Sequence, residues 1–128
     1  LEAATSPIHL PLDIDVEELF IEPFYQLMRQ QLLAAAMEAD KALGLLTVAV
    51  LHVSPAANRA FNMEVPRNLA HLGNDVTDVW SSMLIDRSKF RTTSYEAAWR
   101  RARESDAAEL QGWYEYQEER YPWQNQHE

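Results

Sequence analysis

Two adjacent stretches decide the fold class: Phe24–Leu43, FYQLMRQQLLAAAMEADKAL, and Leu45–Val53, LLTVAVLHV. In the first, apolar residues recur every three or four positions, which predicts a helix buried on a wide face. Pro23 suits the first position of that helix, and Gly44 suits a left-handed residue just after its end. The second stretch is almost continuously apolar, which is typical of a strand covered on both faces.

A buried helix followed directly by a buried strand predicts an α/β domain, with α+β as the alternative fold class. We expect a small mixed sheet with flanking helices and a helix-rich carboxyl-terminal half. Sheets of this kind bind ligands beyond the carboxyl ends of their strands, here at His52 to Asn58. The apolar run is too short to span a membrane.

The composition is that of a globular intracellular protein, and we expect a cytoplasmic location. Of 128 residues, 47% are hydrophobic, and 11 basic against 20 acidic side chains give a net charge of −9. That charge opposes free-standing DNA binding. The lack of cysteine excludes disulfides and thiolate chemistry. Because the chain begins at Leu1 rather than at methionine, a missing upstream segment is an open alternative.

Charge divides the chain into an amino-terminal segment and a larger remainder. Residues 1–22 carry acidic but no lysine or arginine side chains, and apolar residues alternate with others from Leu10 to Val16. This pattern predicts an acidic extended arm or an edge strand. We expect residues 23–128 to form a single α/β domain.

Three further elements are predicted after residue 73. Asn74 or Asp75 is suited to cap a helix whose apolar face runs from Val76 to Leu84. Lys89–Thr92 is a short extended piece. Thr93–Glu96 has the capping-box pattern that opens a helix.

In the helix that follows, one side is apolar and aromatic and the other carries Arg100, Arg101 and Arg103. The last helix is expected over roughly Asp106–Tyr121, where Pro122 ends it. Its aromatic side chains lie among acidic neighbours, which favours core packing or a protein contact over base stacking.

Near its start, the long helix carries a polar stripe formed by Glu22, Gln26, Arg29 and Gln30. These side chains lie about one turn apart and are able to converge on a carboxylate, a water or a phosphate. The alternative is an exposed helix edge that makes ordinary surface hydrogen bonds.

One concentration of basic side chains is a candidate phosphate-backbone contact. The alternative is a solvated face on which these residues pair with Glu96 and Glu104. The candidate nucleic-acid-binding residues are Arg29, Arg87, Lys89, Arg91, Arg100 and Arg101, with Arg103 beside them.

No metal site is predicted in this chain. The carboxylates of residues 13–22 are chemically suited to Mg²⁺, but nothing fixes their geometry, and a solvated acidic arm is the preferred interpretation. The four histidines, at positions 9, 52, 71 and 127, lack the paired spacing of a zinc site. Neither a glycine-rich phosphate loop nor a nucleophile motif occurs, so no autonomous catalytic site is visible.

Three stretches resemble the carboxyl-terminal half of a restriction-endonuclease-like protein of the PD-(D/E)XK nuclease superfamily. They are Glu22–Gln30, Val50–Asn58, and Trp80 with Phe90–Glu96. The resemblance implies a sheet on which an Asp and a Glu-x-Lys bind Mg²⁺ for phosphodiester hydrolysis. No such pair occurs in residues 1–22, so it implies a supporting half whose catalytic carboxylates lie upstream.

By that resemblance, Gln26 or Gln30 corresponds to a glutamine that helps orient the catalytic site, and Arg29 to a phosphate contact. We therefore expect the carboxyl-terminal portion of a metal-dependent DNA endonuclease, or a catalytically silent relative, that is inactive alone. Its implied partners are DNA, through the intact nuclease, and an upstream segment or partner protein. Mg²⁺ belongs to the complete enzyme, and none is expected in this chain.

Two alternatives of a different class stay open. The second hypothesis, after the nuclease, is an acidic interaction module that docks a partner through its aromatic last helix. A surface of net charge −9 is also able to mimic nucleic acid and block a DNA-binding protein.

Overall fold

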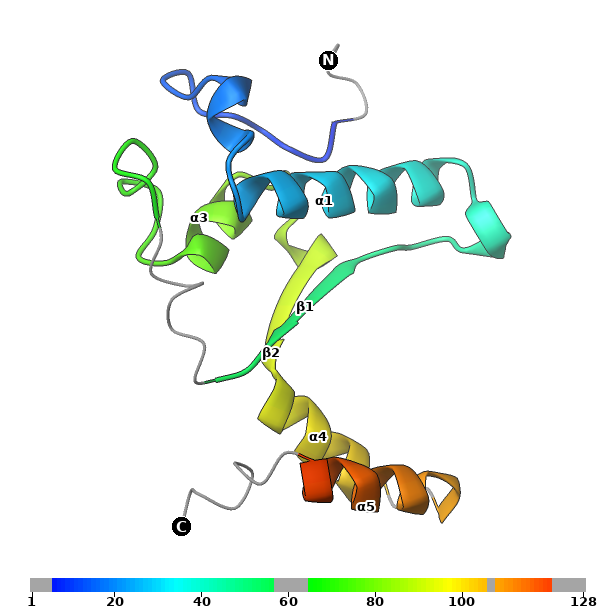
Figure 1. The fold of residues 1–128 in the computed structure, drawn as a ribbon. Coiled ribbons are helices and arrows are strands. Elements are labelled where there is room, and N and C mark those ends of the chain that lie inside the picture. The colour runs from blue at the N-terminus through cyan, green and yellow to red at the C-terminus, as the bar shows by residue number, and fades with distance from the viewer. Residues whose placement is uncertain (1–5, 57–64, 106–107, 121–128) are drawn as a thin grey trace. The chain divides into compact units, whose positions relative to one another are not determined.

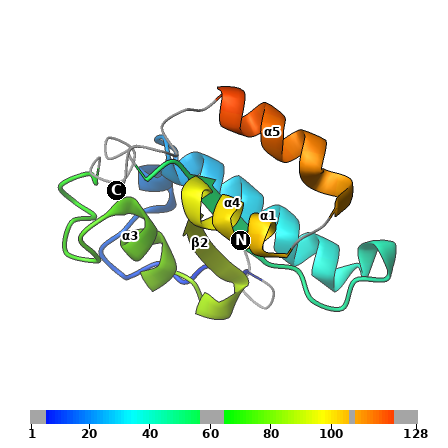
Figure 2. The same ribbon diagram turned by 90° about the horizontal axis from the view of Figure 1, so that it is seen from below.

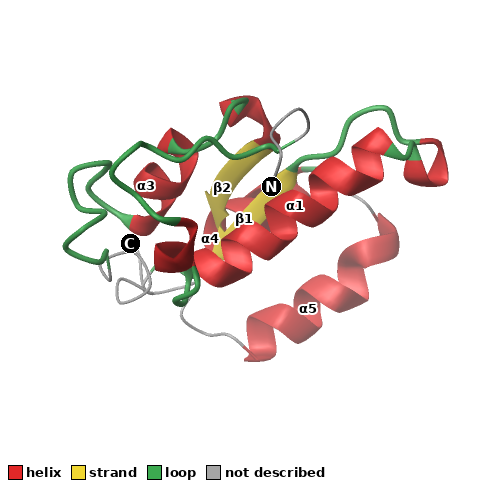
Figure 3. Ribbon diagram, turned by 90° about the horizontal axis from the view of Figure 1, so that it is seen from above, coloured by secondary structure: helices red, strands yellow, loops and turns green. Residues whose placement is uncertain are grey.

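The computed structural model describes residues 6–56, 65–105 and 108–120. In these ranges the fold is mixed α/β, with a small sheet and a helix-rich carboxyl-terminal half, as predicted (Figures 1 and 3). The two strands pair side by side and run in the same direction. The helices and strands are α1 (Phe24–Ala39), β1 (Val50–Ser54), α3 (Val76–Ser82), β2 (Phe90–Ser94), α4 (Tyr95–Glu104) and α5 (Gln111–Arg120).

The chain divides into two compact units. The first unit contains Leu1–His52 and Ala57–Thr92, and the second contains Val53–Ala56 and Thr93–Glu128. The division at residue 22, between an acidic arm and a single domain, stays a prediction.

Helix α1 begins where the sequence predicts but ends four residues early. After Ala39, residues Lys41 and Leu43 take φ values of 49° and 56°, and Gly44 takes 73°. Left-handed backbone cannot continue the right-handed hydrogen-bonding pattern, so the expected last turn becomes a short 3₁₀ turn at Ala42–Gly44. The prediction of a left-handed Gly44 is confirmed.

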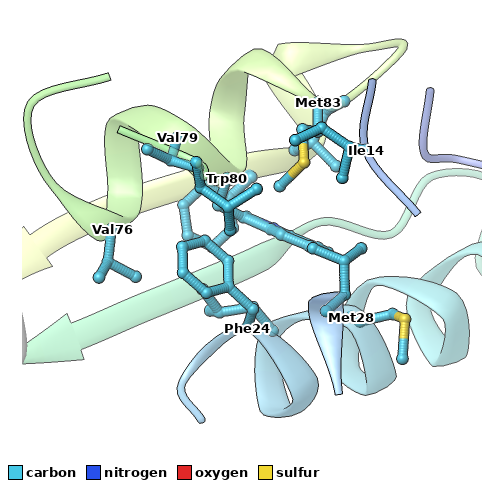
Figure 4. Packing of buried hydrophobic residues seen from close by; sticks show 12 residues of the cluster. Ile14, Phe24, Met28, Val76, Val79, Trp80 and Met83 are labelled. Carbon is cyan, nitrogen blue, oxygen red and sulfur yellow. The ribbon is translucent and has the colours of Figure 1, made fainter. Parts of the chain in front are cut away.

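The core of the first unit lies between α1 and α3 (Figure 4). Trp80 and Phe24 are its largest fully buried side chains. The spacing from Val76 to Leu84 predicts this apolar face, and all five of its apolar residues are buried. The other members of the cluster are Ile14, Leu19, Leu27, Met28, Leu69 and Phe90.

Helix α3 begins at the predicted cap. The Asp75 side chain accepts a hydrogen bond from the backbone amide of Asp78 at 2.8 Å, which satisfies one of the unpaired amides of the first turn. Beyond the helix, Ile8 forms an antiparallel bridge with Leu84. This contact attaches part of the acidic segment to the core, and the same segment continues into a 3₁₀ turn at Val16–Leu19.

The strand expected over Leu45–Val53 is wrong in both extent and burial. β1 covers only Val50–Ser54, and its residues alternate between half-buried and exposed. Leu46 is 78% exposed and Leu51 is 59% exposed. In a two-stranded sheet with its core on one side, alternate residues of a strand face away from that core. The burial on both faces that the apolar composition predicts is therefore wrong.

In the second unit, α4 starts one residue later than the capping-box pattern predicts. The cap is Ser94, whose hydroxyl accepts from the Ala97 amide at 3.0 Å. Glu96 does not complete the box, because its carboxylate accepts instead from the backbone amide of Ala56 at 3.0 Å.

Helices α4 and α5 are joined by an aromatic cluster, and both helices can be followed in Figure 2. The Trp99 ring centroid lies 5.1 Å from that of Trp113 and 5.2 Å from that of Tyr114. The Tyr114 hydroxyl donates to the Ala102 carbonyl at 2.6 Å. Of the expected last helix, Asp106, Ala107 and Tyr121 lie outside the described residues, as does Pro122, which is predicted to end it.

Candidate functional site: a polar pocket beside α1

The predicted polar stripe lies on the solvent side of α1. Glu22, Gln26, Arg29 and Gln30 are all exposed, and the Arg29 guanidinium lies 5.5 Å from the centroid of the Tyr25 ring. The expected supporting role of Gln26 and Gln30 in catalysis, and that of Arg29 in phosphate binding, stay predictions.

The predicted nucleic-acid-binding residues are divided between the two units. Arg87 and Arg91 are exposed in the first unit, and Arg100 and Arg101 are exposed in the second. Lys89 differs from them because its ammonium is held in an ion pair with Glu38. A common binding surface for these side chains stays a prediction.

The polar side chain that α1 does bury is Gln31, which the sequence reasoning missed. Gln31 is 2% exposed, and its Nε2 donates to the backbone carbonyl of Lys89 at 3.4 Å. Its Oε1 is buried and has no hydrogen-bond partner among the described residues. A signal was available, because Gln31 follows Leu27 and Met28 by one helical turn on the apolar face.

Glu38 lies farther along the same helix and makes the main polar contact of the site. Its Oε2 accepts from the Lys89 ammonium at 2.6 Å and from the Val48 backbone amide at 2.7 Å. The Lys89 hydrogen bond, followed by that of Val48, lowers the pKa of Glu38 below its ordinary 4.5. The contact links α1 to the turn before β2, 51 residues away.

These side chains line a cavity of about 470 Å³ in the first unit. Asp86 also lines it, and Asp86 Oδ1 accepts from the hydroxyl and the amide of Ser88 at 2.7 and 2.9 Å. These two bonds lower the pKa of Asp86. The apolar part of the wall consists of Pro7, Ala35, Ala39, Leu46, Val48 and Ile85.

The pocket combines two carboxylates, one ammonium and one buried amide. At neutral pH the formal charge of Glu38, Asp86 and Lys89 together is −1, which favours a cation over a phosphate. Across the described ranges, no group of three or more histidine, aspartate or glutamate side chains is placed to hold a metal ion. His127 lies outside those ranges. Asn58 does as well, so the expected ligand region at His52–Asn58 is described only in part.

The Glu38–Lys89 pair predicts a specific acid sensitivity. A carboxyl whose pKa is lower in the folded chain stabilises the fold above its unfolded pKa, and this contribution is lost as pH falls through the folded pKa. We therefore expect Glu38→Gln to be less stable than the wild type at about pH 6, and the difference to shrink below about pH 4.5. Urea denaturation of both chains across this range measures it. A difference independent of pH would contradict the pairing.

Comparison with known proteins places the chain among restriction-endonuclease-related proteins. A family model described as restriction endonuclease associating with ARP matches residues 3–122, and the chain belongs to that family. No curated protein and no solved structure matches the chain significantly. In the described part of the chain, no helix combines the length and apolar character needed to cross a membrane.

Proposed function

We propose that the chain is the carboxyl-terminal portion of a metal-dependent DNA endonuclease, or a catalytically silent relative of one. The observation that carries the proposal is membership of a family described as a restriction endonuclease, over residues 3–122. The finer assignment to the PD-(D/E)XK superfamily, with Mg²⁺-dependent phosphodiester hydrolysis, is part of the proposal and rests on the resemblance in sequence.

The distribution of charge favours a chain that assists DNA cleavage by a larger protein over one that binds and cleaves DNA alone. The one lysine in the pocket is neutralised by Glu38, and the exposed arginines accompany a net charge of −9. A chain with these properties has weak intrinsic attraction for a phosphate backbone. In this proposal, DNA is bound and cleaved by the complete protein, in which further residues supply catalytic carboxylates.

The family description also names a partner, ARP, with which the endonuclease associates. We propose that this chain takes part in such an association. The second unit offers an observation in favour of protein docking, because Trp113 and Tyr116 on α5 are 44% and 51% exposed. An interaction module that docks through α5 is therefore the second candidate function, and it does not require nuclease activity.

Plasmid cleavage in the presence of Mg²⁺ tests the first candidate. The 128-residue chain is compared with the product of the complete reading frame from which it comes, with and without a chelator. We expect cleavage only by the longer product and only without the chelator. Cleavage by the 128-residue chain alone would contradict the supporting role, and cleavage by neither would favour the interaction module.

Two sets of substitutions separate the candidates. Alanine at Gln26, Arg29 and Gln30 is expected to reduce cleavage by the complete protein and to leave binding to the ARP partner unchanged. Alanine at Trp113 and Tyr116 is expected to weaken binding to the ARP partner and to leave cleavage unchanged. If the first set leaves cleavage unchanged, the role inferred for these residues from the resemblance is wrong.

A further inference from the structure

The polar pocket contains charged side chains to which the chain's family membership assigns no role. We infer that the cavity beside α1 is a site for a hard divalent cation of the Mg²⁺ class, held by Glu38 and Asp86. We further infer that the Lys89 ammonium holds the place of this cation when none is bound. The choice of Mg²⁺ as the ion rests on the proposed function. The site itself is argued from the residues of the pocket alone.

The donor set fits such an ion. Mg²⁺ in proteins is commonly bound by one or two carboxylates and keeps several of its waters. Glu38 and Asp86 both line the cavity, and each makes its hydrogen bonds through a single oxygen, Oε2 and Oδ1 respectively. Within the described residues, the second oxygen of each carboxylate has no hydrogen-bond partner. Two carboxylate oxygens are therefore available to a cation.

The buried amide of Gln31 is the independent observation that points to a ligand. Gln31 lines the same cavity, its Oε1 is a buried acceptor, and no described residue donates to that oxygen. A buried acceptor without a donor destabilises the fold, unless a water or a ligand supplies the missing hydrogen bond. A water in the hydration shell of a bound cation is a suitable donor.

Lys89 explains why the carboxylates are stable together when no metal ion is present. Its Nζ lies 2.6 Å from Glu38 Oε2 and its charge also acts on Asp86. The Lys89 side chain is 23% exposed, and a lysine ammonium on its flexible four-carbon stem is able to move away to solvent. A divalent ion would then replace one positive charge with two between the same carboxylates.

Metal binding by the 128-residue chain, measured without DNA, tests the inference. Titration with Mn²⁺ followed by electron paramagnetic resonance counts bound ions, and competition with Mg²⁺ shows whether the two share the site. We expect one saturable site. Glu38→Gln and Asp86→Asn are each expected to weaken binding by about tenfold or more, because each removes a charged ligand.

The decisive variant is Lys89→Met, which removes the competing ammonium and retains an apolar stem of similar length. It is expected to bind Mn²⁺ about tenfold more tightly than the wild type. Arg87→Met removes the same charge two residues away, outside the cavity lining, and Glu104→Gln removes a carboxylate from α4. Both control variants are expected to stay within about twofold of the wild type, because neither residue lines the cavity or supplies a ligand.

The inference is overturned if Lys89→Met binds no more tightly than the wild type, or if the controls change affinity as much as the pocket variants do. Circular dichroism confirms that each variant is folded, and Lys89→Gln replaces Lys89→Met if the latter unfolds. Saturable binding without plasmid cleavage by the complete protein would retain the site and reject the nuclease proposal. Plasmid cleavage by the complete protein, without metal binding by the 128-residue chain, would retain the nuclease proposal and reject the site.

Discussion

Trp80→Ala is expected to lower the free energy of unfolding of the first unit by about 3–5 kcal/mol, the usual cost of removing a large buried aromatic side chain. Trp80 is fully buried, and it packs against the α1 residues of the core, among them Phe24 (Figure 4). Truncation would leave a cavity at the contact between α1 and α3. Urea denaturation followed by far-ultraviolet circular dichroism measures the loss.

Trp80→Phe provides the matched comparison. The indole Nε1 of Trp80 is buried and has no hydrogen-bond partner among the described residues, so its replacement removes an unsatisfied donor together with part of the ring. We expect Trp80→Phe to cost clearly less than Trp80→Ala. Equal losses from the two variants would show that the ring volume is not what stabilises this contact.

The elements near strong local signals were predictable from the sequence. Asp75 caps α3 as expected, since an aspartate before an apolar helical pattern satisfies unpaired amides through its own side chain. The face from Val76 to Leu84 is buried as expected, because helical spacing alone places these residues on one side. These predictions depend only on neighbours within about two turns.

Predictions that depend on distant contacts were less successful. The apolar run from Leu45 to Val53 indicates a strand, but composition cannot say how many strands or layers will cover it. The first half of the run lies outside any strand, and the Val48 amide donates to the Glu38 carboxylate. That bond joins residues ten positions apart, and no local pattern indicates it.

In the candidate site too, local patterns were predictable and contacts between distant residues were not. The clustering of polar residues at Gln26, Arg29 and Gln30 predicts a site, yet such clustering is also typical of a solvent-facing helix edge. The informative exception was Gln31, a polar residue on the apolar face. Its partner Lys89 lies 58 residues away, so the pocket itself could not be predicted from spacing along the chain.

Gly73→Ala is expected to destabilise the first unit by about 1–3 kcal/mol, the typical cost of overpacking a closely packed position. A Cβ atom added at Gly73 would lie 2.7 Å from the backbone nitrogen of Val79 and 2.9 Å from the carbonyl carbon of Asp78. Both atoms belong to the backbone of α3, so relief requires a shift of the helix or of the turn before it.

The control is Gly112→Ala, which introduces the same methyl group in α5, where no atom other than those of its chain neighbours and of the helix's own backbone lies within 4 Å of the added carbon. Alanine is favoured over glycine in a helix by up to about 1 kcal/mol, so this variant is expected to be neutral or slightly stabilising. Thermal unfolding of both variants beside the wild type measures the contrast. If Gly73→Ala melts at the wild-type temperature, the packing of the turn against α3 is looser than the structure indicates. Opposite effects of the same substitution would instead show that the close approach at α3, and not glycine's flexibility, requires Gly73.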